Sequence, residues 1–135
     1  MDENIILDSN LWIAYFNEND SMHKSATEIF KKQKKIIIPE YIILETATIL
    51  LLKANRKIAK MFIEIIFDNN DIEIIPSNNI FLFKTKNQFL ENKTGKLSFV
   101  DCGLVELSKN YKIITFDKEL QKSIDKKKNN KLRNS

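Results

Sequence analysis

The chain has 135 residues, 43% of them hydrophobic and 30% charged, which is enough for one domain with its own core and excludes a wholly disordered chain. One cysteine, Cys102, and one histidine, His23, exclude an internal disulfide and a zinc site built from several Cys or His ligands. The net charge is +4, but residues 122–135 contain six basic residues and one acid, so residues 1–121 sum to −1.

Short apolar runs alternate with longer amphipathic stretches along the whole chain, without an internal repeat or a linker. The short runs predict buried parallel strands at residues 4–8, 35–38, 71–76 and 112–115. Apolar residues at helical spacing, preceded by capping residues, predict helices at residues 9–16, 21–31, 40–53, 56–68, 78–91 and 98–110, with a last short helix after Asp117. Residues 92–96 are expected to be a loop. This alternation predicts an α/β fold with a parallel sheet covered on both faces.

The two ends of the chain carry no sign of membrane insertion or export. No apolar run approaches the roughly 20 residues that span a bilayer, and no basic segment followed by an apolar one begins the chain. We therefore expect a cytoplasmic protein.

Residues 1–124 are expected to form the domain and residues 125–135 a flexible basic tail. That tail is either a solvated end that aids solubility or an arm that attracts phosphates through Lys126, Lys127 and Lys128.

Four acidic residues have unusual surroundings. Asp8 and Asp117 follow the apolar parts of two predicted strands, at the edge where open α/β sheets form ligand sites. Glu45 is the only charge within residues 41–52, and Asp101 interrupts a second apolar segment. A carboxylate in such surroundings is costly unless it is paired, protonated or bound to a metal.

Each acid also has a structural interpretation. Asp8 and Asp117 could cap the helices that follow them, and Asp101 could lie in the first turn of a helix, where the dipole favours an acid. Together, however, three or four carboxylates without a cluster of His or Cys select hard cations such as Mg²⁺ or Mn²⁺. Such ions support phosphoryl chemistry, which needs no protein nucleophile.

Four segments in order resemble the motifs of PIN-domain ribonucleases, and the size of the chain resembles that of the VapC-type toxins of toxin–antitoxin pairs. The segments are Ile6-Leu7-Asp8-Ser9-Asn10, the isolated Glu45, Leu97-Ser98-Phe99-Val100-Asp101 and Ile113-Ile114-Thr115-Phe116-Asp117. The resemblance covers residues 5–120. It implies a three-layer α/β/α sandwich with a central parallel sheet.

The resemblance further implies a metal-dependent endoribonuclease. Asp8, Glu45 and Asp101 would be its Mg²⁺ or Mn²⁺ ligands, and Asp117 a more variable fourth acid. The supporting polar positions would be Ser9, Asn10, Ser98 and Thr115. The expected partners are RNA, an antitoxin protein and a second copy of the chain. A homodimer is expected because the helix at residues 56–68 is apolar enough to cover a partner.

Two alternatives remain open within this resemblance. The chain could be a housekeeping RNA-processing nuclease without an antitoxin, or a PIN-like binding module without catalysis. Two other classes fit less well. A phosphatase of the haloacid-dehalogenase type needs a second Asp where Asn10 stands, and a receiver domain needs a phospho-accepting Asp where Pro76 and Ser77 stand.

Overall fold

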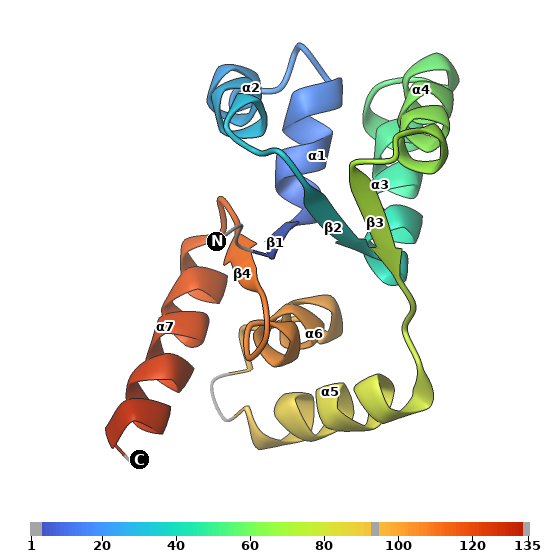
Figure 1. Cartoon of the computed structure of the whole chain (residues 1–135). Coiled ribbons are helices and arrows are strands. Elements are labelled where there is room, and N and C mark those ends of the chain that lie inside the picture. Colours follow the sequence, from blue (N-terminus) through green and yellow to red (C-terminus); the bar gives the residue numbers. More distant parts are fainter. Residues whose placement is uncertain (1–3, 93–94, 134–135) are drawn as a thin grey trace.

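Four parallel strands form the centre of the molecule in the computed structural model, which describes residues 4–92 and 95–133 (Figure 1). The strands are β1 (Ile5–Leu7), β2 (Ile36–Pro39), β3 (Ile72–Ile75) and β4 (Lys112–Ile114). Their order in the sheet is β3-β2-β1-β4, with Ile6 aligned with Ile37 on one side and Ile113 on the other. The predicted parallel sheet is therefore confirmed.

Helices cover both faces of the sheet, so the predicted three-layer sandwich is confirmed as well. Helices α1 to α4 lie on one side and α5 to α7 on the other (Figure 1). Their bounds are α1 (Ser9–Phe16), α2 (His23–Lys31), α3 (Glu40–Lys53), α4 (Arg56–Asp68), α5 (Asn79–Glu91), α6 (Phe99–Leu107) and α7 (Lys118–Arg133). Among the residues described, no helix is long and apolar enough to cross a membrane.

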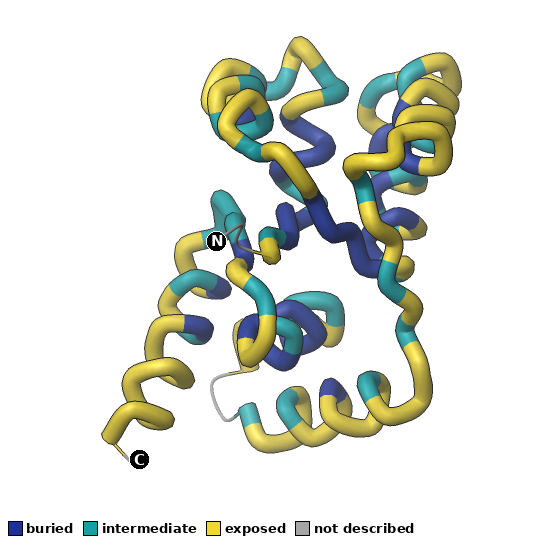
Figure 2. Tube along the Cα trace, viewed as in Figure 1, coloured by how far each residue is buried: buried dark blue, intermediate teal, exposed yellow. Residues whose placement is uncertain are grey.

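The core lies between the central strands and the inner faces of the helices, as Figure 2 shows in dark blue. Both central strands are apolar throughout, Ile-Ile-Leu in β1 and Ile-Ile-Ile-Pro in β2, because each is covered on two faces. On the α1–α4 side, the Trp12 ring meets Phe30 edge-on at 4.9 Å and Phe62 edge-on at 5.7 Å between ring centroids. These contacts pack α1 against α2 and α4.

The last helix is longer than predicted. Residues 125–133, expected to be a flexible tail, continue α7 without a break. Residue 124 instead marks the end of burial, because Ile124 is buried and the helix beyond it is exposed. The extension has no Pro or Gly, and acidic Glu119 in the first turn with basic Lys131 and Arg133 in the last turn complement the helix dipole. Residues 134–135 of the predicted tail and 93–94 of the predicted loop lie outside the described residues.

The strand order reverses next to β1. From β1 the chain moves outward through β2 to β3, and it then returns to place β4 on the opposite side of β1. In open parallel sheets, ligands bind outside the carboxyl ends of the strands at such a reversal. The residues that follow β1 and β4 are Asp8 and Thr115, so the topology itself selects this edge as the place to look for a site.

Candidate carboxylate site

Asp8 is held between the ends of β1 and β4. Its backbone N–H donates to the carbonyl of Ile114 at 2.9 Å, which continues the sheet pairing by one residue. Its side chain caps α1, since Oδ1 accepts a hydrogen bond from the Ser9 amide at 2.7 Å. The Ser9 hydroxyl lies 3.4 Å from the same oxygen. The capping interpretation of Asp8 is therefore correct, and it leaves Oδ2 for other partners.

Thr115 and Asn10 complete a polar network around Asp8. The Thr115 hydroxyl donates to Asp8 Oδ2 at 2.7 Å, and the Asn10 amide donates to Thr115 Oγ1 at 3.1 Å. Asn10 Nδ2 also lies 3.4 Å from Asp8 Oδ2. On the other side of Asn10, its Oδ1 accepts the backbone amide of Phe116 at 3.2 Å. Three of the predicted supporting positions, Ser9, Asn10 and Thr115, thus contact the first acid.

Asp8 is an acid in an unfavourable environment for its charge. Its side chain is almost fully buried, and burial raises the pKa of the Asp8 carboxyl from its usual 3.8 to about 6. Hydrogen bonds from Thr115 and Ser9 oppose that rise, whereas the charges of Asp101 and Glu45 add to it. The structure therefore brings Glu45 and Asp101 within electrostatic reach of Asp8, although they lie on different helices.

Glu45 and Asp101 are positioned in different ways. Asp101 lies in the first turn of α6 and forms a capping box with Ser98, in which Oδ2 accepts the Ser98 amide at 3.2 Å and the Ser98 hydroxyl accepts the Asp101 amide at 3.0 Å. Glu45 is half-buried in the middle of α3, and its carboxylate makes no hydrogen bond or ion pair with the described residues. The Glu45 carboxylate is thus the least constrained of the three.

Asp117 has a different role from the other acids in this structure. Its Oδ1 accepts the backbone amides of Glu119 at 2.9 Å and Leu120 at 3.2 Å, so it caps α7. Its own amide donates to Thr115 Oγ1 at 3.0 Å, which connects it to the Asp8 network through the backbone. Its carboxylate is not among the charges that shift the pKa of Asp8.

A hard divalent cation fits these residues by donor type. In the part of the chain that the structure describes, no three Asp, Glu, His or Cys side chains lie close enough together to hold a metal ion as they stand. The donors that Asp8, Glu45 and Asp101 offer are carboxylate oxygens, the ligands that Mg²⁺ and Mn²⁺ prefer. Asp101 and Glu45 also disfavour the charge on Asp8, a repulsion that a cation between them would relieve. A shared ion requires these side chains to move toward one another.

Two of the candidate RNA-binding lysines lie beside α6, the helix that carries Asp101. Lys126 and Lys127 of α7 line a cavity of about 350 Å³ together with Cys102 of α6. Burial raises the pKa of the Cys102 thiol, the charge of Asp101 raises it further, and the charge of Lys127 opposes both. Lys127 is therefore within electrostatic reach of the residue next to Asp101. Lys128 lies on the same helix and is exposed.

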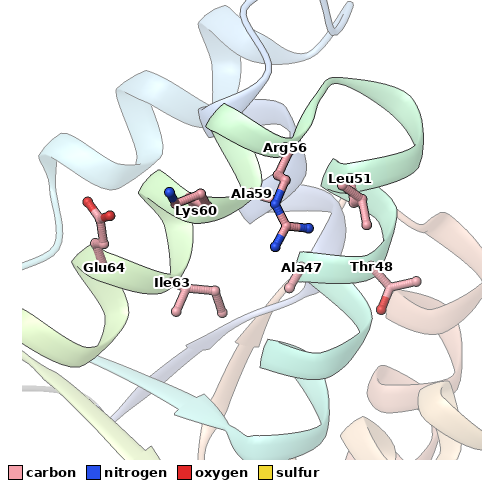
Figure 3. Close-up of a pocket in the computed structure, with 8 residues that line it drawn as sticks. All are labelled: Ala47, Thr48, Leu51, Arg56, Ala59, Lys60, Ile63 and Glu64. Atoms are coloured by element: carbon pink, nitrogen blue, oxygen red, sulfur yellow. The ribbon is translucent and has the colours of Figure 1, made fainter.

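A separate cavity of about 360 Å³ lies between α3 and α4 and contains none of the four acids (Figure 3). Figure 3 shows the Arg56 side chain extending from α4 toward α3, with Ala47 below its guanidinium group and Leu51 to one side. All of the cavity's lining residues belong to α3 and α4. The cavity is therefore distinct from the carboxylate site.

Tyr41, which the sequence pattern does not single out, lies beside the carboxylates. Burial raises the pKa of the Tyr41 phenol, and the charges of Asp8, Glu45 and Asp101 raise it further. One tyrosine in an apolar helix looks like a core residue. The only sequence signal is its position four residues before Glu45, which places both on one face of α3.

The parallel three-layer sandwich and the carboxylates near its strand reversal place the chain in the class of α/β proteins with an acidic site. The sequence matches the PIN domain family over residues 5–127, and the chain belongs to that family. Among solved structures, it is similar to VapC20 of Mycobacterium tuberculosis, described as a sarcin-ricin loop cleaving toxin. The TM-score is 0.80 at 18% sequence identity, and the match covers 89% of this chain and 95% of that one. No curated protein sequence matches closely enough to be called a relative.

Proposed function

We propose that this protein is a metal-dependent endoribonuclease and the toxin of a toxin–antitoxin pair. The observation that carries the proposal is the buried Asp8 at the strand reversal, with the charges of Glu45 and Asp101 acting on it. Membership of the PIN domain family supports a ribonuclease, and the fold shared with a VapC toxin supports the toxin role.

In this proposal Asp8, Glu45 and Asp101 hold Mg²⁺ or Mn²⁺, with Asp117 as a more variable fourth acid. When bound, such an ion lowers the pKa of a water molecule and stabilises charge on the phosphodiester. Thr115 and Ser9 orient the Asp8 carboxylate, and Ser98 fixes Asp101 in the first turn of α6. With a pKa of about 6, Asp8 is mostly ionised at neutral pH and can bind a cation there.

The proposed substrate is RNA, bound first through its phosphates. The chain has a net charge of +4, and α7 alone carries seven basic residues against two acids, with Lys126 and Lys127 beside α6. A reaction centred on the phosphate does not read the base, so the choice of cleavage site depends on the walls of the groove. VapC20 is described as cleaving the sarcin-ricin loop, and this RNA is a reasonable first substrate to assay.

The proposed protein partners are an antitoxin and a second copy of the chain. Helices α3 and α4 together expose six large apolar side chains: Leu44, Leu51, Leu52, Met61, Ile65 and Phe67. A homodimer through this surface would cover part of them. The antitoxin would then supply a segment that blocks the carboxylate site.

The test is cleavage of RNA by the purified protein. We expect cleavage with Mg²⁺ or Mn²⁺ and none with EDTA. Asp8→Asn and Asp101→Asn should each lose at least about a hundredfold in rate while keeping the fold, because removing a residue of a metal site removes its chemistry. Asp71→Asn, an exposed aspartate in the turn before β3, is the matched control. Equal cleavage by the parent and Asp8→Asn would reject the proposed site.

The genomic neighbourhood separates the toxin from the housekeeping alternative. A small reading frame upstream that encodes a DNA-binding antitoxin supports the toxin role. Cleavage by the protein without such a neighbour favours an RNA-processing enzyme. RNA binding without cleavage under any divalent ion would leave the binding module as the function.

A further inference from the structure

One side chain connects the helices that carry two of the proposed cation ligands. The Tyr41 hydroxyl, on α3, donates to the carbonyl oxygen of Val100, on α6, at 3.3 Å. Tyr41 lies one helical turn before Glu45, on the same face of α3. Val100 directly precedes Asp101. This hydrogen bond therefore joins the turn of α3 that precedes Glu45 to the turn of α6 that contains Asp101.

The close approach of these two helices depends on a glycine. A Cβ atom added to Gly103 would lie 2.8 Å from the Tyr41 hydroxyl oxygen and 3.1 Å from Cζ of the same ring. It would also lie 3.1 Å from Cζ of Phe81. Any side chain at residue 103 would thus push the tyrosine away from α6. Glycine is required at residue 103 because α3 and α6 meet around the Tyr41 phenol and leave no room for a side chain.

The tyrosine ring is fixed on its other side. It stacks on Phe81 of α5, with ring centroids 5.7 Å apart and an angle of 25° between the planes. Both rings line an apolar cavity of about 140 Å³ that Gly103 and Val100 also line. Thr85 contributes a hydroxyl to the same wall, but it donates to the Phe81 carbonyl at 2.8 Å and is already satisfied. The hydrogen-bond partner of the Tyr41 hydroxyl is thus the Val100 carbonyl of α6 and not the Thr85 hydroxyl.

We propose that Tyr41 is a positioning residue that fixes the separation of the segments of α3 and α6 that carry Glu45 and Asp101, and that Gly103 provides the space this requires. The inference rests on the proposed function, because the separation matters when both carboxylates hold one cation. A tyrosine that served only to fill the core would not need its hydroxyl. The stacked ring alone would supply the packing, and phenylalanine would replace it without effect on the site.

The first experiment removes only the hydroxyl. Tyr41→Phe is compared with Tyr15→Phe, which removes the hydroxyl from another stacked tyrosine, on Phe30 at 4.2 Å between centroids. Mn²⁺ affinity is measured by electron paramagnetic resonance of the free ion, and RNA cleavage gives kcat and KM. For Tyr41→Phe we expect the Mn²⁺ affinity and kcat each to fall about tenfold while KM stays unchanged, as for other residues that orient metal ligands. Tyr15→Phe should match the parent in all three.

The second experiment tests the contact with Gly103 by rescue. Gly103→Ala should lower kcat by more than Tyr41→Phe does, because its methyl group displaces the phenol. Adding Tyr41→Phe removes the oxygen at 2.8 Å and leaves two ring carbons at 3.1 Å, Cζ of residue 41 and Cζ of Phe81, separations that shifts of a few tenths of an ångström relieve. The double variant should therefore cleave faster than Gly103→Ala alone. If the two substitutions acted independently, the double variant would instead be the slowest.

The outcomes separate this inference from the proposed function. If the parent cleaves RNA and Tyr41→Phe equals it in Mn²⁺ affinity and kcat, the positioning role is rejected and the nuclease stands. If the parent does not cleave RNA, the proposed function fails, and Mn²⁺ affinity alone decides whether Tyr41 positions the carboxylates. A double variant slower than Gly103→Ala also rejects the inference. If Gly103→Ala does not fold by circular dichroism, Tyr41→Phe decides the question.

Discussion

Replacing Asp8 with Asn should stabilise the protein when no metal is bound. The pKa of Asp8 is about 6 in the fold and near 3.8 in the unfolded chain, so its charged form is disfavoured by folding. Above pH 6 the folded state bears this cost in full. The cost declines as pH falls through 6 and is absent below 3.8.

The size of the expected stabilisation follows from the pKa shift of Asp8. A difference of about two pKa units corresponds to about 3 kcal/mol of unfolding free energy at pH 7. Asn keeps an oxygen for the Ser9 amide but removes the acceptor of the Thr115 hydroxyl, which offsets about 1 kcal/mol. The net gain of about 2 kcal/mol should raise the melting temperature by roughly 6 °C in a domain of this size. At pH 5 the gain should be smaller by about 1 kcal/mol.

The assay is thermal unfolding followed by circular dichroism in EDTA, at pH 7.5 and pH 5. The parent and Asp8→Asn are compared with Asp71→Asn, an exposed aspartate that should melt with the parent at both values. Added Mn²⁺ should raise the melting temperature of the parent more than that of Asp8→Asn. If Asp8→Asn melts below the parent at pH 7.5, or if the difference does not shrink at pH 5, the electrostatic reasoning is wrong.

Three further outcomes can be measured. Asp117→Asn should reduce the rate of RNA cleavage about tenfold or less, because Asn can still cap α7 and water can replace a fourth ligand. A reduction equal to that of Asp101→Asn would place Asp117 among the core ligands. A chain ending at Ile124 should bind RNA with a slope of log affinity against log salt that is shallower by about 0.7 for each phosphate that the removed basic residues neutralise; an unchanged slope would assign the end of α7 to solubility. Light scattering at micromolar concentration should show a dimer that Leu52→Glu on exposed α3 converts to a monomer, and a monomeric parent would contradict the proposed interface.

The strand positions could be predicted because a short apolar run in the sequence marks each strand. Runs such as Ile36-Ile37-Ile38 are buried on both faces, and burial on two faces leaves little room for polar residues. The length of α7 could not be predicted in the same way. The residues of its second half are exposed, so no apolar periodicity marks it, and the charges at its two ends favour the helix.

The site shows the same division between local and distant causes. The caps made by Asp8 and Asp117, and the position of Asp101 in the first turn of α6, follow from neighbours in sequence and could be predicted from them. These structural roles coexist with the electrostatic interaction among Asp8, Glu45 and Asp101, so the two interpretations are not exclusive. The close approach of Tyr41 to Gly103 depends on how α3 crosses α6, which no local pattern specifies.

The hydrogen bond from Thr115 to Asp8 spans 107 positions in the chain, which constrains the order of folding. During synthesis, β1, β2 and β3 can pair as they emerge, because they are neighbours in the sheet in that order. Strand β4 closes against β1 only after the intervening chain exists. A growing chain that lacks residues 112–117 therefore has Asp8 without the hydroxyl that orients it. The acidic site is thus complete only after β4 and Thr115 have been synthesised and have reached β1.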